Sequence, residues 1–326
     1  MDSNNHAWHC HPASAATTHP RYPAAMARVI SAAHLRKTYG DIVAVDDVSL
    51  DVERNEIFGI IGPNGSGKTT TVECLQGLRI PDNGEISVLD LDPRSQGPLL
   101  RRRIGSQLQE SALPDRIKVW EALDLFAAAA PQRHDWRDSA RQWGIFDRRN
   151  AAFATLSGGE RQRLFIALAL ISNPEIVFLD EMTTGLDPVA RRVAWSLIKS
   201  VREQGATIVL ITHFMDEVEA LCDRVAVFRK GGVIELDSPK GLVGRHGRIR
   251  TVRFSADSAD LAWLSDVPNV HSVERDGHEI AVRGEGAVLA QLGAALVGRG
   301  LAPADLRVEI PTLEDIYVEL VQENER

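Results

Sequence analysis

The sequence predicts an α/β fold with a mainly parallel sheet, a helix-rich subdomain and a small α+β domain at its C-terminal end. Three observations support this prediction. Strand-like and helix-like segments alternate up to about residue 240, which requires crossover connections between parallel strands. One apolar strand pattern ends directly in a glycine-rich loop at residues 62–69. Beyond about residue 245 the pattern changes to short strands mixed with two helical segments.

The composition is that of a packed globular protein. Of the 326 residues, 44% are hydrophobic and 25% are charged, so extensive disorder is not indicated. The formal net charge of −8 argues against nucleic acid as the main partner, because neutralising many phosphates requires a dominant basic surface. The three cysteines, Cys10, Cys74 and Cys222, are far apart and lack disulfide-type or metal-type spacing, which fits a reducing compartment.

Residues 1–27 are expected to form a leader without fixed structure, because His, Pro, Ser, Thr and Ala occur there without periodicity. The alternative is a transition-metal site, since His6, His9, Cys10 and His11 offer imidazole and thiolate ligands. The segment lacks the basic-then-apolar order of a secretory signal, and no stretch reaches the roughly 18 apolar residues of a membrane span. We therefore expect a cytoplasmic location.

The main domain is expected over residues 28–245. Alternating or continuous apolar runs bounded by glycine predict its strands, and Ala-rich stretches without strand character predict a helical subdomain at about 110–155. In order, we expect strands at 45–52 and 56–61, a helix at 69–78, a strand at 86–91, and helices within 116–154.

A rise in glycine density at residues 241–249 indicates a domain boundary, so residues 246–326 are expected to form the small α+β accessory domain. Its expected strands are at 250–254, 271–275 and 279–283, and its expected helices are at 258–264 and 287–299.

The glycine-rich loop matches the phosphate-binding pattern G-x-x-x-x-G-K-[ST], and it lies between a strand and a helix as that chemistry requires. Its glycines allow backbone N–H groups to converge on phosphate oxygens, and the following helix adds its positive N-terminal end. Lys68 is expected to reach the β- and γ-phosphates, and Thr69 to bind Mg²⁺. A plain glycine turn is the alternative. The predicted nucleotide-binding residues of this loop are Gly62, Pro63, Asn64, Gly65, Ser66, Gly67, Lys68, Thr69 and Thr70.

A second segment narrows the choice among phosphate-loop proteins. Leu156-Ser-Gly-Gly-Glu-Arg-Gln-Arg163 precedes a helical pattern, and Ser157 and Glu160 have capping-box spacing, so a simple helix start is the alternative. An apolar run, Ile176 to Leu179, ends 23 residues after Ser157 in two acids, Asp180 and Glu181. Such a strand places its acids at the carboxyl edge of a parallel sheet, where ligands bind in these folds.

Together these segments resemble the ATP-binding cassette (ABC) family of P-loop NTPases, in which Leu-Ser-Gly-Gly is the signature motif; the resemblance covers residues 28–240. It implies that ATP is the ligand and that two cassettes pair head to tail. Ser157, Gly158 and Gly159 of one copy then close over the nucleotide held by the phosphate loop of the other. The helix N-terminus at Ser157 suits an anion. Glu160 is a departure, since the family more often has Gln there.

The resemblance also assigns roles to the acids. Asp180 is expected to hold Mg²⁺ through water, and Glu181 to act as the general base on the attacking water. Solvated turn residues are the alternative. Met182 follows where the family usually has Pro, so we expect a slightly looser turn.

Four further residues match family motifs. Asp187 lies in the segment that crosses the dimer interface, and His213, 32 residues after Glu181, matches the histidine that contacts the γ-phosphate. Gln109 matches the glutamine that links the metal site to the membrane partner, with Gln107 as a rival. Tyr39, 23 residues before Gly62, resembles the aromatic that stacks on adenine, with a buried structural tyrosine as the alternative.

The single phosphate loop favours transport, because soluble translation-type members of the family usually carry two cassettes in one chain. The C-terminal stretch Pro311 to Leu320, together with the small domain before it, resembles the C-terminal extension of drug-exporter ATPases of the daunorubicin-resistance type. This implies ATP hydrolysis that powers export of a drug-like or other hydrophobic substrate through a separate integral membrane permease subunit. It also implies a second copy of the chain or a related ATPase as the dimer partner, and a position on the inner face of the cell membrane. The alternative is an ABC-type ATPase that acts on a soluble partner such as a ribosome or DNA.

Overall fold

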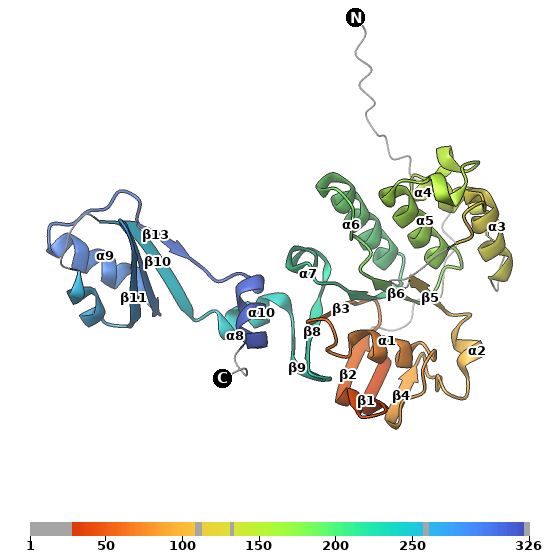
Figure 1. The fold of residues 1–326 in the computed structure, drawn as a ribbon, viewed down its shortest axis with the longest axis horizontal. Coiled ribbons are helices and arrows are strands. Elements are labelled where there is room, and N and C mark those ends of the chain that lie inside the picture. Colours follow the sequence, from red (N-terminus) through yellow and green to blue (C-terminus); the bar gives the residue numbers. More distant parts are fainter. Residues whose placement is uncertain (1–27, 108–112, 131–133, 257–260, 323–326) are drawn as a thin grey trace, which may run out of the picture.

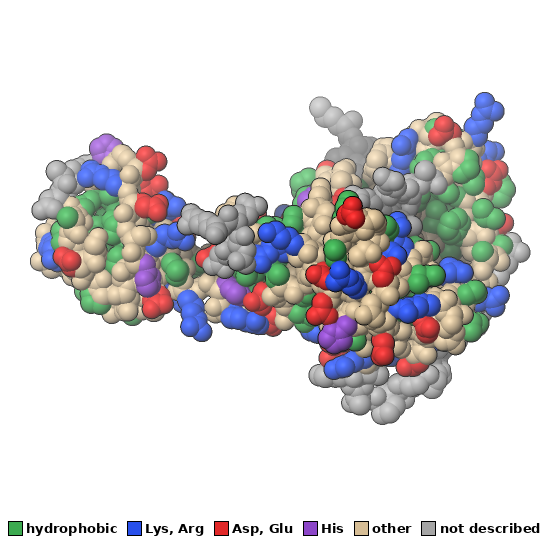
Figure 2. Space-filling view, turned by 60° about the horizontal axis from the view of Figure 1, so that its bottom comes forward, with side chains coloured by type: hydrophobic (Ala, Val, Ile, Leu, Met, Phe, Trp, Pro, Cys, Tyr) green, Lys and Arg blue, Asp and Glu red, His purple; other side chains and the backbone are tan. Residues whose placement is uncertain are grey.

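The computed structural model describes residues 28–107, 113–130, 134–256 and 261–322. The expected leader with His6, His9, Cys10 and His11, and also Gln109, lie outside the described residues. A large body and a small C-terminal domain are joined by a narrow waist (Figure 1). Figure 2 shows acidic and basic side chains interspersed over the visible face of both parts. Among the described residues, no helix is long and apolar enough to cross a membrane.

The body is built on a six-stranded sheet in which only the last strand is antiparallel, as the sequence predicts. Every position of its three central strands is buried. Alternate side chains of these strands enter two separate hydrophobic clusters, one on each side of the sheet. In spatial order the strands are β5 (Ile104–Gln107), β6 (Ile176–Asp180), β7 (Thr207–Ile211), β3 (Ile57–Ile61), β8 (Arg224–Arg229) and β9 (Gly232–Asp237).

One face of this sheet is covered by a three-stranded antiparallel sheet and helix α1 (Lys68–Leu75). The expected strand at 86–91 is shifted, because Leu89 and Asp90 have φ of 53° and 62° and turn the chain after Val88. The expected helix at 69–78 is likewise shorter at its end. The covering strands are β2 (Ile42–Glu53), β1 (Arg28–Tyr39) and β4 (Asn83–Val88), followed by the short α2 (Gly97–Leu100).

Helices cover the other face, and the described part of 116–154 is helical or irregular apart from one isolated bridge, as expected. Trp143 is 1% exposed and is the largest fully buried side chain of the described residues. In order, the elements are α3 (Val119–Ala129), α4 (Trp136–Gln142), η1 (Phe146–Arg148), η2 (Phe153–Thr155), α5 (Gly158–Leu170), α6 (Pro188–Glu203) and α7 (Met215–Leu221).

The glycine-rich stretch at 241–249, where the sequence indicates a domain boundary, is mostly helical. Helix α8 (Pro239–His246) forms because Pro239 occupies its first turn and the Ser238 hydroxyl accepts a hydrogen bond from Gly241 N at 3.0 Å.

The small domain is an antiparallel sheet with two helical crossovers on one face, a split β-α-β arrangement. The expected helix at 258–264 is a 3₁₀ helix in its described part, and a short fourth strand joins the three that were expected. In spatial order the strands are β11 (Val270–Asp276), β12 (Glu279–Glu285), β10 (Ile249–Ser255) and β13 (Arg307–Glu309), with η3 (Ala262–Asp266) and α9 (Val288–Gly298).

The last helix, α10 (Leu313–Gln322), returns to the body. Leu313, Ile316 and Leu320 belong to the same hydrophobic cluster as the central sheet, and α10 packs beside α8 and α7 (Figure 1). Arg229 Nη1 donates a hydrogen bond to Leu320 O at 2.6 Å. The chain therefore leaves the body through α8 and re-enters it through α10.

Candidate functional site

The sheet order brings four predicted segments to one edge. Strands β5, β6, β7 and β3 are neighbours and run parallel, so the residues after their carboxyl ends lie in a row. The row consists of Gln107 at the end of β5, the acids Asp180 and Glu181 of β6, His213 after β7, and the glycine-rich loop after β3.

The loop has a backbone that only glycine adopts easily. Gly67, the residue before α1, has φ of 95°, and a Cβ there would collide with the carbonyl oxygen of Ala44 in β2. Gly62 is packed against Phe228, and a Cβ there would lie 2.7 Å from Ser66 Oγ. The loop is thus held in shape from below by β2 and β8, while Asn64, Gly65 and Thr69 are exposed on its outer side.

Lys68 folds back over this loop. Its Nζ donates hydrogen bonds to the carbonyl oxygens of Gly62 at 2.8 Å and Pro63 at 2.9 Å. Burial lowers the pKa of Lys68, and the nearby charges of Asp180 and Glu181 oppose that shift. The loop residues that remain are half-buried Pro63 and Thr70, and Ser66, whose buried hydroxyl has no hydrogen-bond partner in the described structure.

The two acids of β6 differ in environment. Asp180 is 6% exposed, and burial, followed by the neighbouring charge of Glu181, raises the pKa of Asp180 to about 6. Glu181 has φ of 50°, a conformation that costs free energy for a residue with a Cβ. This turn aims its side chain along the edge of the sheet, where Oε1 lies 3.2 Å from Nδ1 of His213. The structure therefore pairs the predicted base with the predicted histidine.

Gln107, the rival of Gln109, lies beside the acids. It is 5% exposed, and its Nε2 donates to the Asp180 carbonyl oxygen at 3.3 Å. Its Oε1 is buried without a partner in the described residues. The preferred Gln109 is outside them, so the choice between the two stays a prediction.

The donor set suits Mg²⁺. Magnesium is usually held by one or two protein oxygens together with nucleotide phosphates. Thr69 offers an exposed hydroxyl at the start of α1, and Asp180 offers a carboxylate that faces the charge of Lys68. Within the described structure, no group of three or more His, Cys, Asp or Glu side chains could hold a metal ion by itself.

The signature segment begins helix α5. Ser157 Oγ accepts from Glu160 N at 3.3 Å, and Glu160 Oε2 accepts from Ser157 N at 2.8 Å, so both the functional and the capping interpretation of the sequence fit. Glu160 Oε1 also lies 3.0 Å from Arg148 Nε. The departure from Gln thus adds a charge that an arginine neutralises. Nothing in the sequence spacing indicated Arg148 as this partner.

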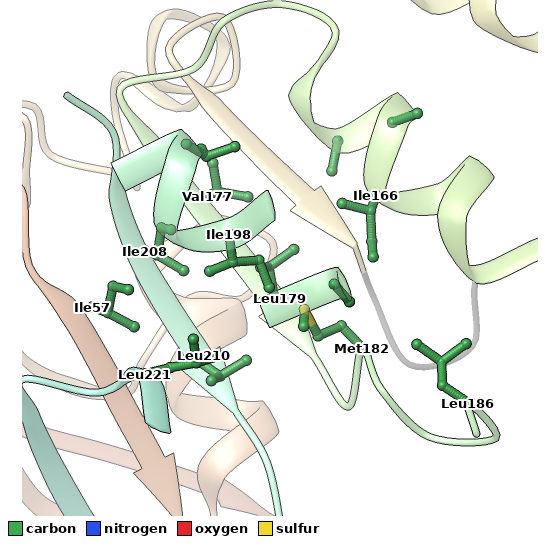
Figure 3. Close-up of a cluster of buried hydrophobic side chains, with 14 of the residues drawn as sticks. Ile57, Ile166, Val177, Leu179, Met182, Leu186, Ile198, Ile208, Leu210 and Leu221 are labelled. Carbon is green, nitrogen blue, oxygen red and sulfur yellow. The ribbon is translucent and has the colours of Figure 1, made fainter. Parts of the chain in front are cut away.

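Met182, which stands where the family usually has proline, is buried in the core. Its side chain is 0% exposed and packs into the cluster that also holds Leu179 and Leu186 (Figure 3). This burial anchors the turn after Glu181 through apolar contacts.

Asp187 and Tyr39 lie at the margins of the site. Asp187 Oδ1 accepts from Val189 N and Ala190 N, both at 2.9 Å, and thereby caps α6. It also lines, with Ser157, a cavity of about 240 Å³ between α5 and α6. Tyr39 is 40% exposed, so it is not a buried structural tyrosine. Lys37 Nζ and Arg79 Cζ lie 5.5 and 5.4 Å from its ring centroid.

The known proteins that this chain is similar to are ATP-binding subunits of transporters. A family model described as ABC transporter matches residues 45–184. Nod factor export ATP-binding protein I of Cupriavidus pinatubonensis is 35% identical over 307 residues, which cover 91% of each chain. A probable multidrug ABC transporter ATP-binding protein of Escherichia coli is 34% identical over 251 residues, covering 76% of this chain and 43% of that protein.

Solved structures agree. The ATP-binding subunit of an ABC transporter superposes with a TM-score of 0.62 at 25% identity, covering 67% of this chain and 93% of the other. A bacterial ABC transporter cassette solved as a dimer has a TM-score of 0.58 at 27% identity, with coverage of 64% and 98%. The phosphate loop, the acidic strand end and the signature helix thus occur in one fold with relatives along most of the chain, and the protein belongs to the ABC transporter family as an ATP-binding and ATP-hydrolysing subunit.

Proposed function

We propose that this subunit powers export of a drug-like or other hydrophobic substrate through a separate integral membrane permease, which holds it on the inner face of the cell membrane. The similarity to proteins named as export ATP-binding subunits carries this proposal, because it spans 91% of the chain and so includes the small C-terminal domain as well as the cassette. The substrate itself is selected by the permease.

The working unit is a head-to-tail dimer of this chain, or of this chain and a related ATPase. Support comes from the position of Ser157, Gly158 and Gly159 at the N-terminus of α5, where backbone N–H groups and the helix dipole favour a phosphate. A Cβ at Gly158 would meet nothing within 4 Å, so this face is open to a partner. A related cassette was solved as a dimer, which supports a dimeric working unit.

The chemistry follows from the row of side chains at the sheet edge. Lys68 and the loop N–H groups bind the phosphates, and Tyr39 stacks on adenine. Thr69 and Asp180, with Gln109, would hold Mg²⁺, which when bound would supply positive charge to neutralise the phosphates. Glu181 accepts the proton of the attacking water, and His213, which faces it at 3.2 Å, orients this carboxylate and contacts the γ-phosphate. Asp187 lies in the segment that contacts the second subunit across the dimer interface.

Kinetics of two variants test these roles. Glu181→Gln should lower kcat by about 100-fold or more while ATP still binds, since only proton acceptance is lost. Lys68→Ala should weaken ATP binding about tenfold or more, because a charge-assisted hydrogen bond contributes about 1.5–3 kcal/mol. Glu203→Gln and Lys199→Ala, exposed on α6, are the matched controls. Normal turnover of Glu181→Gln would refute its role as the base.

Affinity purification from membranes tests the exporter proposal. The subunit should retain a membrane protein with several apolar spans, and drug-like compounds should stimulate ATP hydrolysis by that complex. Repeated recovery of ribosomes or DNA instead, with no membrane protein, would overturn the export assignment and leave the ATPase chemistry untouched.

A further inference from the structure

A buried carboxylate lies behind the row of catalytic side chains. Glu217, in helix α7, is 0% exposed, although its neighbours Asp216 and Glu219 are both exposed. A glutamate at this depth is rare without partners, because removing its charge from water costs several kcal/mol. The position therefore requires a reason beyond helix formation.

Three segments meet at this carboxyl group. Trp195 of α6 donates from Nε1 to Glu217 Oε1 at 3.1 Å. Thr183 and Thr212, 0% and 1% exposed, lie near the same carboxyl in the loops after β6 and β7, although Trp195 is the only side chain of the described residues that is hydrogen-bonded to it. We call Thr183, Trp195, Thr212 and Glu217 the α7 corner.

Two of these segments carry the predicted catalytic residues. Thr183 stands two residues after Glu181, and Thr212 stands immediately before His213. Thr212 Oγ1 also accepts from Phe214 N at 3.1 Å, so it fixes the backbone on both sides of the histidine. The corner thus joins the loop of the base to the loop of the histidine.

The neighbouring charges support the same geometry from the solvent side. Arg191 of α6 donates to Asp216 Oδ2 at 3.1 Å and lies 4.4 Å from the ring centroid of Phe214. The Phe214 ring lies 4.1 Å from that of His213. Helix α6 therefore contacts the histidine loop through Arg191 at the surface and through Trp195 in the interior.

We infer that Glu217 is a positioning residue. Its buried carboxyl ties α7 to α6 through Trp195, and this link holds the Glu181 loop, which leads to α6, and the His213 loop, which leads to α7, in register so that the two side chains face each other. It touches neither nucleotide nor water itself. This inference rests on the proposed roles of Glu181 and His213.

The protonation of the Glu217 carboxyl determines which substitution should preserve its positioning role. Burial raises the pKa of Glu217, and the polar side chains of Thr212, Trp195 and Thr183 oppose the shift to a smaller extent. Oε2 of Glu217 and Oγ1 of Thr183 are buried without a hydrogen bond in the described residues. A neutral amide has the same shape and still accepts from Trp195, so Gln should replace Glu where Leu cannot.

The test measures kcat, ATP affinity and melting temperature for Glu217→Leu, Glu217→Gln and Trp195→Phe. Glu217→Leu should lower kcat by roughly 10-fold or more with ATP affinity within about twofold, because a displaced base loses rate and not ground-state binding. Glu217→Gln should restore most of this loss. Trp195→Phe removes the N–H donor and keeps an aromatic, though smaller, ring. It should lower kcat by a few fold, and it keeps the test possible if the Leu variant does not fold.

Val218→Ala is the control for lost stability alone. Val218 is also 0% exposed on α7, but it has no polar contact with the corner, so its kcat should match that of the wild type even if its melting temperature falls. Wild-type kcat in a folded Glu217→Leu would overturn the inference, and so would Glu217→Gln as impaired as Glu217→Leu. Glu181→Gln and His213→Ala run in the same series: if they too retain full kcat, the proposed catalytic roles fail instead.

Discussion

The central sheet of the cassette and the sheet of the C-terminal domain differ in how many of their faces are covered by other elements. Strands β3, β6 and β7 are buried at every position between two layers, and their carboxyl edge carries the nucleotide site. Within the described residues, the C-terminal sheet has helices on one face, and its other face carries ion pairs such as Arg253 with Glu309 at 2.7 Å. A sheet covered on both sides needs long crossovers, and these create the loops in which phosphate chemistry is possible.

The largest expected effect comes from matched truncations in the two sheets. Phe178→Ala in β6 and Phe254→Ala in β10 each empty a buried site, 1% and 0% exposed, and each should cost about 3–5 kcal/mol. Because the two phenylalanines belong to separate clusters, only Phe178→Ala should abolish ATP hydrolysis. Calorimetry and ATPase assays check this. Equal loss of activity in both variants would show that the two sheets unfold as one unit.

A smaller effect concerns pH. A carboxyl whose folded pKa is raised binds more protons when folded, so its contribution to stability falls as pH rises above the ordinary value of 4.5. Glu217→Gln removes this loss. Its melting temperature relative to the wild type should therefore be higher at pH 7.5 than at pH 5.0. Glu203→Gln, at an exposed site on α6, is the control, and a difference that shrinks with rising pH would contradict the assignment.

The smallest expected effect is on the charged face of the C-terminal sheet. Arg253→Ala breaks pairs with Glu309 and Glu279, but these side chains are a third or more exposed, and such pairs contribute at most about 1 kcal/mol. Denaturant titration should show a change below that value, and ATPase activity should stay at the wild-type level. A larger loss of unfolding free energy would contradict the interpretation that this face of the sheet is exposed to solvent.

The same contrast explains what the sequence could predict. The glycine-rich loop, the signature segment and the acidic strand end were recognisable because each needs particular residues at fixed spacing. The helix at 239–246 was not, since Gly241 and Gly244 resemble a linker and only capping by Ser238 and packing against α10 make it helical.

Burial of single polar residues was also beyond prediction. Asp216, Glu217 and Glu219 read alike as residues of an acidic surface helix, and only the packing of α6 against α7 distinguishes Glu217. The turn at Leu89 and Asp90 likewise depends on left-handed backbone conformations, which these two residue types did not predict.

The paired helices α8 and α10 define how this protein can be divided. The chain leaves the body through α8 and returns through α10. The C-terminal domain is therefore an insertion between two helices of the cassette, and α10 completes the cassette after it. A stop codon before β10 would also delete α10 and uncover the apolar surface that Leu313, Ile316 and Leu320 protect. Excision of residues 249–309, with α10 retained, should remove the C-terminal domain and leave the cassette's hydrophobic cluster covered.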